Sequence, residues 1–127
     1  MRRREDTELV PNEVKLLVTA IAVTTSGEPE FHGYALAKEL AALEGSQIPM
    51  SQSTLYRALR RLEGRGALES RWESIEEVAD AGRDGPPRRY YTVTASGLAA
   101  ARAAAGRSER MGSVPAWKSW VPNLQRG

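Results

Sequence analysis

The sequence contains no cysteine and only one histidine, His32. Disulfide bonds and thiolate chemistry are therefore excluded, and a single imidazole cannot complete the usual zinc site. No nucleophile, general base and orienting group occur together, and the acidic residues between positions 69 and 84 lack the spacing of a calcium loop. We therefore expect a protein that is not an enzyme and that has no metal site and no cofactor.

Long apolar runs are also missing. No segment approaches the roughly 18 consecutive apolar residues that a membrane span needs, and the basic start of the chain is not followed by the apolar stretch of a signal peptide. We therefore expect a cytoplasmic protein with no membrane partner. The 127 residues, 41% of them hydrophobic, suffice for one compact domain with a modest extension.

The net charge is only +2, but the charges are unevenly distributed along the chain. Residues 47–65 carry four arginines and one glutamate, whereas residues 69–84 carry six carboxylates and two arginines. From residue 88 onward positive charge predominates again. Basic segments that flank an acidic one make binding to nucleic acid a reasonable hypothesis.

Four segments have the spacing or the capping residues of helices. Apolar residues three and four positions apart predict a helix from about residue 12 to Thr25 and a second from about residue 32 to Gly45. Ser51 is expected to cap a third helix that ends near Gly64, and Thr94 is expected to cap a fourth that is rich in alanine.

Two segments between the third and fourth helices lose the helical period. Residues 67–73 and 89–94 have the character of strands, and the second is rich in aromatic and β-branched residues. We expect the two strands to pair. Residues 75–87, which contain two glycines and two prolines, are expected to form a long hairpin loop at the tip.

This order of elements predicts an α+β, mainly helical fold class. It consists of a winged helix-turn-helix domain, with three helices and a two-stranded β wing, and a C-terminal dimerisation helix. We expect residues 1–11 to be a flexible basic arm and residues 12–94 to be the DNA-binding winged helix domain. Residues 95–127 would supply the dimerisation helix and a tail that carries two tryptophans.

Three segments in this order resemble the PadR family of transcriptional regulators. They are HGYALAKEL at residues 32–40, STLYRALRRLE at 53–63 and RRYYTVTASG at 88–97, and the resemblance extends from about residue 12 to residue 107. It implies a homodimer that places two recognition helices in successive major grooves of double-stranded DNA, often under the control of a small-molecule effector. We therefore expect a sequence-specific regulator, with repression as the commoner sign.

The third helix carries the side chains expected to contact DNA. Helix N-termini favour anions, and Gln52 has the donor and acceptor needed to pair with adenine. Arg57 and Arg60 share a face and can meet phosphate or guanine together, whereas Arg61 points partly elsewhere. Where the hairpin returns, an arginine is expected to enter the minor groove. The candidate DNA-binding residues are Ser51, Gln52, Ser53, Thr54, Tyr56, Arg57, Arg60, Arg61, Arg88 and Arg89.

Each of these assignments has a plainer alternative. The helix arginines could form a solvated face paired with Glu63 or neighbouring residues, and the hairpin arginines could pair across the strands with Glu69 or Glu73. The acidic tip would be repelled by phosphate, so we expect it to bend away from the duplex. A winged helix that binds another protein rather than DNA is the alternative function, because a fold does not dictate its function.

A second group of residues is assigned to a dimer interface or an effector site. The apolar stripe of the first helix and the tail tryptophans offer more apolar surface than one small domain readily covers. Whether the tail tryptophans cover a helix within the dimer or line a pocket for a planar apolar effector stays open, and Trp72 is assigned to ordinary strand packing. The dimer or effector residues are Val14, Leu17, Ile21, Leu98, Trp117 and Trp120.

Overall fold

The computed structural model describes residues 9–122 and 124, so the expected N-terminal arm lies mostly outside the described residues. The elements follow one another as helices, a β hairpin and a further helix. They are α1 (Pro11–Thr25), β1 (Phe31–His32), α2 (Gly33–Leu43), α3 (Gln52–Gly64), β2 (Leu68–Trp72), α4 (Ile75–Asp80), β3 (Arg89–Val93), α5 (Ala95–Arg110) and the 3-10 helix η1 (Ala116–Ser119). This order confirms the α+β, mainly helical fold class.

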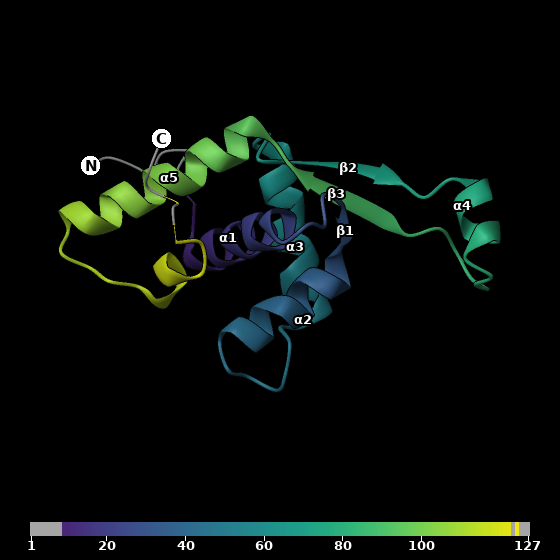
Figure 1. The fold of residues 1–127 in the computed structure, drawn as a ribbon, viewed down its shortest axis with the longest axis horizontal. Helices are drawn as coiled ribbons and strands as arrows, with labels where there is room; N and C mark the ends of the chain where they lie inside the picture. Colours follow the sequence, from purple (N-terminus) through teal and green to yellow (C-terminus); the bar gives the residue numbers. More distant parts are fainter. Residues whose placement is uncertain (1–8, 123, 125–127) are drawn as a thin grey trace.

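Helix α1 lies at the centre of the molecule and contacts α2, α3 and α5 (Figure 1). Val14, Leu17 and Ile21 are 6%, 0% and 6% exposed, because these neighbouring helices cover them. We assigned these three residues to a dimer interface or an effector site, and the chain buries them in its own core, which leaves no dimer surface on this stripe. The periodic apolar stripe on α1 therefore reflects the packing of a single chain.

The expected helix caps are present at α3 and α5. The Ser51 hydroxyl accepts a hydrogen bond from the Thr54 backbone N–H at 3.3 Å, and Thr94 Oγ1 accepts one from Gly97 N–H at 2.9 Å. Each hydroxyl satisfies a backbone donor that the first turn of a helix leaves without a partner. The two caps fix where α3 and α5 begin.

The sheet contains a strand that the sequence pattern did not predict. Strands β2 and β3 form an antiparallel hairpin, with partners running from Leu68 opposite Val93 to Trp72 opposite Arg89. The short strand β1 pairs with the other edge of β3, which gives the strand order β1-β3-β2. The hairpin extends away from the helices and forms the wing of the fold (Figure 1).

The tip of the wing is not the continuous loop that we expected over residues 75–87. Helix α4 forms there because the Ser74 hydroxyl accepts the Glu77 N–H at 3.1 Å, and the Glu77 carboxylate accepts the Ser74 N–H at 2.8 Å. This reciprocal capping box supports a short helix at the far end of the hairpin. The glycines and prolines that indicated a loop follow it.

The C-terminal tail folds back onto α1 and α5. Trp117 and Trp120 are half-buried and pack against the core, and Leu124 is buried within it. The tail contains the 3-10 helix η1. Among the described residues, no helix is both long enough and apolar enough to span a membrane.

Candidate nucleic-acid interface

A glycine allows α2 and α3 to approach closely. A Cβ atom added at Gly33, the first residue of α2, would lie 2.9 Å from Leu59 Cδ1 and 3.2 Å from Tyr56 Cε1. Both partners belong to α3. Helix α2 therefore sets the position of α3 through contacts that leave no room for a side chain at Gly33.

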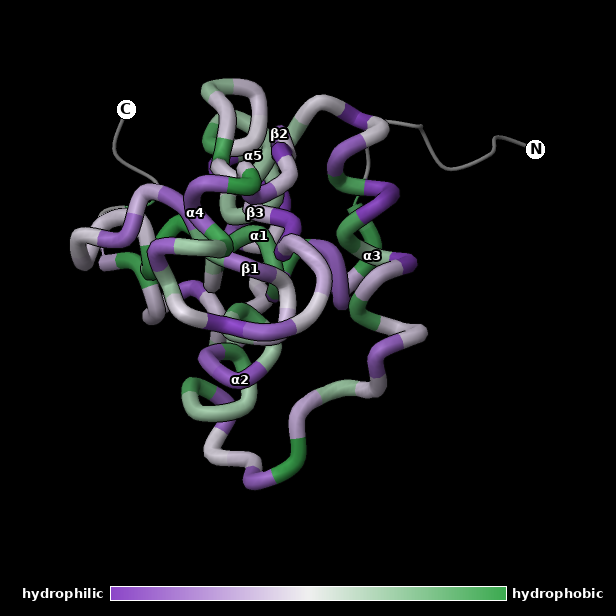
Figure 2. Tube along the Cα trace, turned by 90° about the vertical axis from the view of Figure 1, so that its right-hand side faces the viewer, coloured by the Kyte–Doolittle hydropathy of each residue, from purple (hydrophilic) through white to green (hydrophobic). Residues whose placement is uncertain are grey.

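Helix α3 has one buried face and one polar face. Its apolar residues Leu55, Ala58, Leu59 and Leu62 are buried against the core. Hydrophilic residues alternate with these along the helix (Figure 2). The outward positions belong to residues that we expected to contact DNA. They are Gln52, Ser53, Tyr56, Arg57, Arg60 and Arg61, all of which are exposed.

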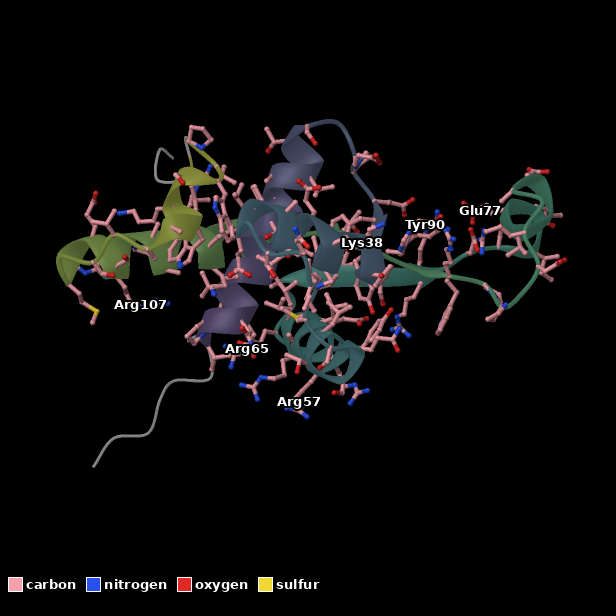
Figure 3. The ribbon with its side chains drawn as sticks, turned by 90° about the horizontal axis from the view of Figure 1, so that it is seen from below. Lys38, Arg57, Arg65, Glu77, Tyr90 and Arg107 are labelled. Carbon is pink, nitrogen blue, oxygen red and sulfur yellow. The ribbon has the colours of Figure 1, made fainter. Side chains whose placement is uncertain are left out.

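Two arginines on this outer face have no carboxylate partner in the part of the chain that the structure describes. Arg57 points away from the body of the molecule (Figure 3). Within residues 9–122 and 124, neither Arg57 nor Arg60 forms an ion pair. The alternative in which they pair with Glu63 does not occur in the structure, so both guanidinium groups face solvent and are available to an anionic partner.

Arg61 has a different role from its neighbours. Its Nε donates a hydrogen bond to the carboxylate of Glu13, which is buried in α1. The other oxygen of that carboxylate accepts the Val10 backbone N–H at 3.1 Å. Arg61 therefore connects α3 to α1, and only part of its guanidinium group remains open to solvent.

A groove of about 600 Å³ separates α3 from the wing. Helix α3 contributes Tyr56, Arg60 and Glu63 to its wall, and the wing contributes arginine and aromatic side chains. Besides these three, the lining residues are His32, Tyr34, Trp72, Pro87, Arg88, Arg89 and Tyr91. The groove therefore combines positive charge with flat aromatic surfaces, a combination that suits the sugar-phosphate backbone of a nucleic acid.

Arg89 is held in place on the floor of this groove. Its Nε donates to Ser70 Oγ at 3.0 Å, and its Nη2 lies 3.3 Å from Glu63 Oε2. The guanidinium carbon lies 5.0 Å from the centroid of the Trp72 ring. The alternative pairing of Arg89 with Glu69 or Glu73 does not occur, and the partner is Glu63, on α3. The side chain of Arg88 is exposed, while its backbone N–H donates to Glu73 at 3.0 Å.

The opposite face of the wing carries a separate charge cluster. Arg71 donates two hydrogen bonds to Glu30, which precedes β1, and two to Glu77 of α4. These bonds raise the pKa of Arg71 and lower the pKa of Glu77 to about 2. Tyr90 and Glu77 mark this cluster along the wing (Figure 3). One face of the wing therefore carries the ion pairs of Arg71, and the other face borders the groove beside α3.

Part of the acidic charge at the wing tip is also neutralised. Glu73 accepts hydrogen bonds from Arg83, from the Arg88 backbone and, at 3.3 Å, from the Tyr90 hydroxyl. Its pKa is lowered, chiefly by the bond from Arg83. Glu73 and Glu77 were expected to repel phosphate, but the charge of each is offset by an arginine.

A second, mainly apolar pocket of about 460 Å³ lies between the end of α1, the start of α5 and the tail. Leu98, which we assigned to a dimer or effector site, lines it together with Ile21, Val93 and Val121. Trp117 and Trp120 are not among its lining residues. The structure therefore brings Leu98 and Ile21 together and places the tail tryptophans elsewhere, against the core.

Glu63 and Trp72 line the α3–wing groove, and Ser70 is hydrogen-bonded to both Glu63 and Arg89, yet the sequence pattern made none of these residues a candidate. Trp72 was assigned to strand packing, yet it is 60% exposed. The alternation of β2 places Ser70 and Trp72 on one face of the wing, and this signal was available in the sequence. That Glu63 faces them depends on how α3 packs against β2, which no local pattern gives.

The fold and the exposed basic face of α3 define a winged helix of the DNA-binding class. Residues 23–103, more than half of the chain, match the PadR-like family of transcriptional regulators. The chain belongs to this family, and is therefore a transcriptional regulator and not an enzyme. A comparison with curated protein sequences found no match.

Solved structures of bacterial regulators have the same fold. A PadR family transcriptional regulator from Eggerthella lenta is 28% identical, with a TM-score of 0.52 over 80% of each chain. A transcriptional regulator from Clostridium thermocellum is 20% identical, with a TM-score of 0.56 over 77% of this chain and 84% of that one. A PadR-like transcription factor from Bacteroides fragilis is 22% identical, with a TM-score of 0.53 over 80% and 87%.

Proposed function

We propose that the chain binds specific sequences of double-stranded DNA as a homodimer and represses transcription. The observation that carries this proposal is the outer face of α3, where Arg57 and Arg60 have no ion-pair partner in the described chain. Both can face the duplex while the opposite face of the helix stays packed in the core. In the proposed complex α3 lies in the major groove and the wing lies beside the phosphate backbone.

The proposed contacts differ in what they contribute. Gln52 and Arg57 have side chains that can recognise adenine and guanine edges, whereas Tyr56, Arg60 and Arg88 border the groove and are assigned to phosphates. Ser51, Ser53 and Thr54 surround the N-terminus of α3, which attracts phosphate. Arg61 contributes mainly positive charge, because Glu13 engages its Nε. Arg89 completes the proposed set.

The proposed dimer interface involves the end of α5 and the tail. Met111 and Val114 are 81% and 87% exposed, and these large apolar side chains would be covered by a partner chain. Trp117 and Trp120 lie in the following segment. We assign residues 12–94 to DNA binding and residues 95–127 to dimerisation. Sedimentation at micromolar concentration is expected to give a dimer, and a monomer would count against this assignment.

The apolar pocket beside Leu98 is the proposed site for a small apolar effector. Three elements meet there: α1, α5 and the tail. A ligand that binds one arrangement of these elements more tightly than another would change the spacing of the two recognition helices. We propose that this regulation operates in the cytoplasm, where a bacterial-type regulator meets DNA.

The wing tip favours one other candidate function. Ile75, on α4, is 82% exposed beside several carboxylates, which suits a module that binds another protein. Selection of bound fragments from genomic DNA, followed by titration over a range of salt concentrations, separates the two functions. DNA binding is expected to weaken steeply with salt because phosphate contacts release counterions. Absence of salt-dependent duplex binding would favour the protein-binding module.

A further inference from the structure

The salt bridge between Glu63 and Arg89 crosses the proposed DNA-binding groove. Glu63 lies on α3 and Arg89 on β3, and both line the groove together with Arg60 and Arg88. Their closest nitrogen–oxygen distance is 3.3 Å, and the side chains of Arg89 and Glu63 are 38% and 33% exposed. A glutamate in the middle of a basic groove weakens the attraction of that groove for phosphate. Its presence there needs a physical reason.

The energetics of this pair allow Arg89 to exchange its partner. Ion pairs between partly exposed side chains contribute little to stability, because water screens the charges. A phosphate offers Arg89 a stronger, bidentate acceptor than Glu63 does at distances of 3.3 and 3.4 Å. A phosphate that enters the groove can therefore displace the carboxylate.

The neighbouring residues keep both partners satisfied during such an exchange. Ser70 Oγ donates to Glu63 at 2.5 Å, so the carboxylate keeps a hydrogen bond after Arg89 leaves it. The indole of Trp72 lies beneath the guanidinium group at 5.0 Å and supports it in either position. The exchange therefore leaves no charged group without a partner.

We propose that Glu63 is a positioning residue that holds Arg89 across the groove in the free protein and releases it to a DNA phosphate on binding. This inference rests on the proposed function. Glu63 thereby reduces the affinity for DNA of any sequence, because each encounter must first displace the carboxylate. Contacts made by the outer face of α3 then account for a larger share of the total affinity for specific DNA.

A double-mutant cycle tests this proposal with a labelled random-sequence duplex. Glu63→Gln is expected to tighten binding about two- to fivefold, the range expected when a partly exposed ion pair no longer opposes binding. It is also expected to steepen the slope of log affinity against log salt concentration by up to about one. In the parent, Glu63 takes up a cation from solution when Arg89 leaves it, which lowers the net number of ions released on binding. In an Arg89→Ala background the same substitution is expected to give a smaller gain, because it then removes a negative charge from the groove but no longer releases Arg89.

The matched control is Glu69→Gln, which removes one carboxylate from an exposed position on β2, the neighbouring wing strand, without touching the pair. It is expected to change affinity less than Glu63→Gln. Thermal melting confirms that each variant is folded, and glutamine retains the acceptor for Ser70. The proposal is overturned if folded Glu63→Gln binds no more tightly than the parent, or if its gain is undiminished in the Arg89→Ala background. If the parent itself shows no salt-dependent duplex binding, the proposed function fails as well.

Discussion

Arg61 of α3 is bound through its Nε to Glu13 of α1, a carboxylate whose residue is only 1% exposed. The arginine side chain is 44% exposed, so the pair joins the interior of the molecule to the surface proposed to face DNA. Glu13 also accepts the backbone N–H of Val10 at the start of α1. One buried carboxylate therefore fixes the beginning of α1 and the orientation of α3.

Glu13→Gln is expected to destabilise the fold by about 1–2 kcal/mol, because glutamine keeps the shape and one acceptor but loses the charge that Arg61 requires. Urea unfolding would measure the change. The control is Glu44→Gln, which breaks an exposed pair with Lys15 and is expected to cost well under about 1 kcal/mol. Equal effects of the two substitutions would show that burial gives Glu13 no special role.

Replacing Arg57 and Arg60 together by alanine is expected to weaken DNA binding while leaving the melting temperature close to that of the parent. Each lost phosphate contact is expected to reduce the salt slope by about one, whereas a lost bidentate guanine contact would cost about 1–3 kcal/mol at one base position. Parental affinity and salt dependence in the folded double variant would exclude α3 as the DNA-reading element.

Gly97→Ala is expected to destabilise the protein by about 1–3 kcal/mol or more, because the added Cβ would lie 2.2 Å from the carbonyl oxygen of Ala67. Backbone atoms cannot move aside as the end of a flexible side chain can. Gly106→Ala in the same helix is the control, since its nearest contact is 3.4 Å from a mobile arginine nitrogen. That variant is expected to melt at or above the parental temperature, because alanine favours helix more than glycine does.

His32 is expected to make stability depend on pH below neutrality. Burial lowers the pKa of His32, and the positive charges of Arg88 and Arg83 lower it further. As the pH falls, the unfolded chain therefore binds the proton first. The contribution of His32 to the free energy of unfolding is fully present above about pH 6.5 and is lost as the pH drops toward the lower pKa of the folded state. Protonation also removes the Nδ1 acceptor that caps Ala35 N–H at 3.4 Å.

Melting temperatures measured between pH 8 and pH 5 test this expectation. His32→Asn is the control variant, because asparagine can cap a helix but does not titrate. Its melting temperature is expected to vary less over this interval than that of the parent. A parallel pH dependence in the two proteins would assign the effect to other groups.

The parts of the fold that could be predicted from the sequence depend on local signals. Ser51 and Thr94 cap α3 and α5 as expected, since a capping hydroxyl acts within three residues of itself. Strand β1 was missed because its two residues gain strand character only by pairing with Tyr90 and Tyr91, far along the chain. Helix α4 was missed although Ser74 and Glu77 have the spacing of a capping box.

In the candidate site, too, the features that follow from local sequence signals were predicted, and those that depend on contacts between distant segments were not. The helical period places Arg57 and Arg60 on the outer face of α3, and the structure agrees. It could not indicate that Arg61 would meet Glu13, because that contact depends on how α1 crosses α3. Periodicity also identified the apolar stripe around Leu17 without indicating that this chain, and not a partner, covers it.

The contact of Gly33 with Tyr56 and Leu59 divides α3 into positions that can vary and positions that cannot. Relatives with different target sequences would be expected to differ at Gln52 and Arg57, whose side chains form no hydrogen bond or ion pair within residues 9–122 and 124. The residues opposite Gly33 would have to keep their size, because a change there would displace every outward side chain at once. A transplant of new binding specificity into this scaffold would therefore exchange the outward residues and retain the pair that rests on the glycine.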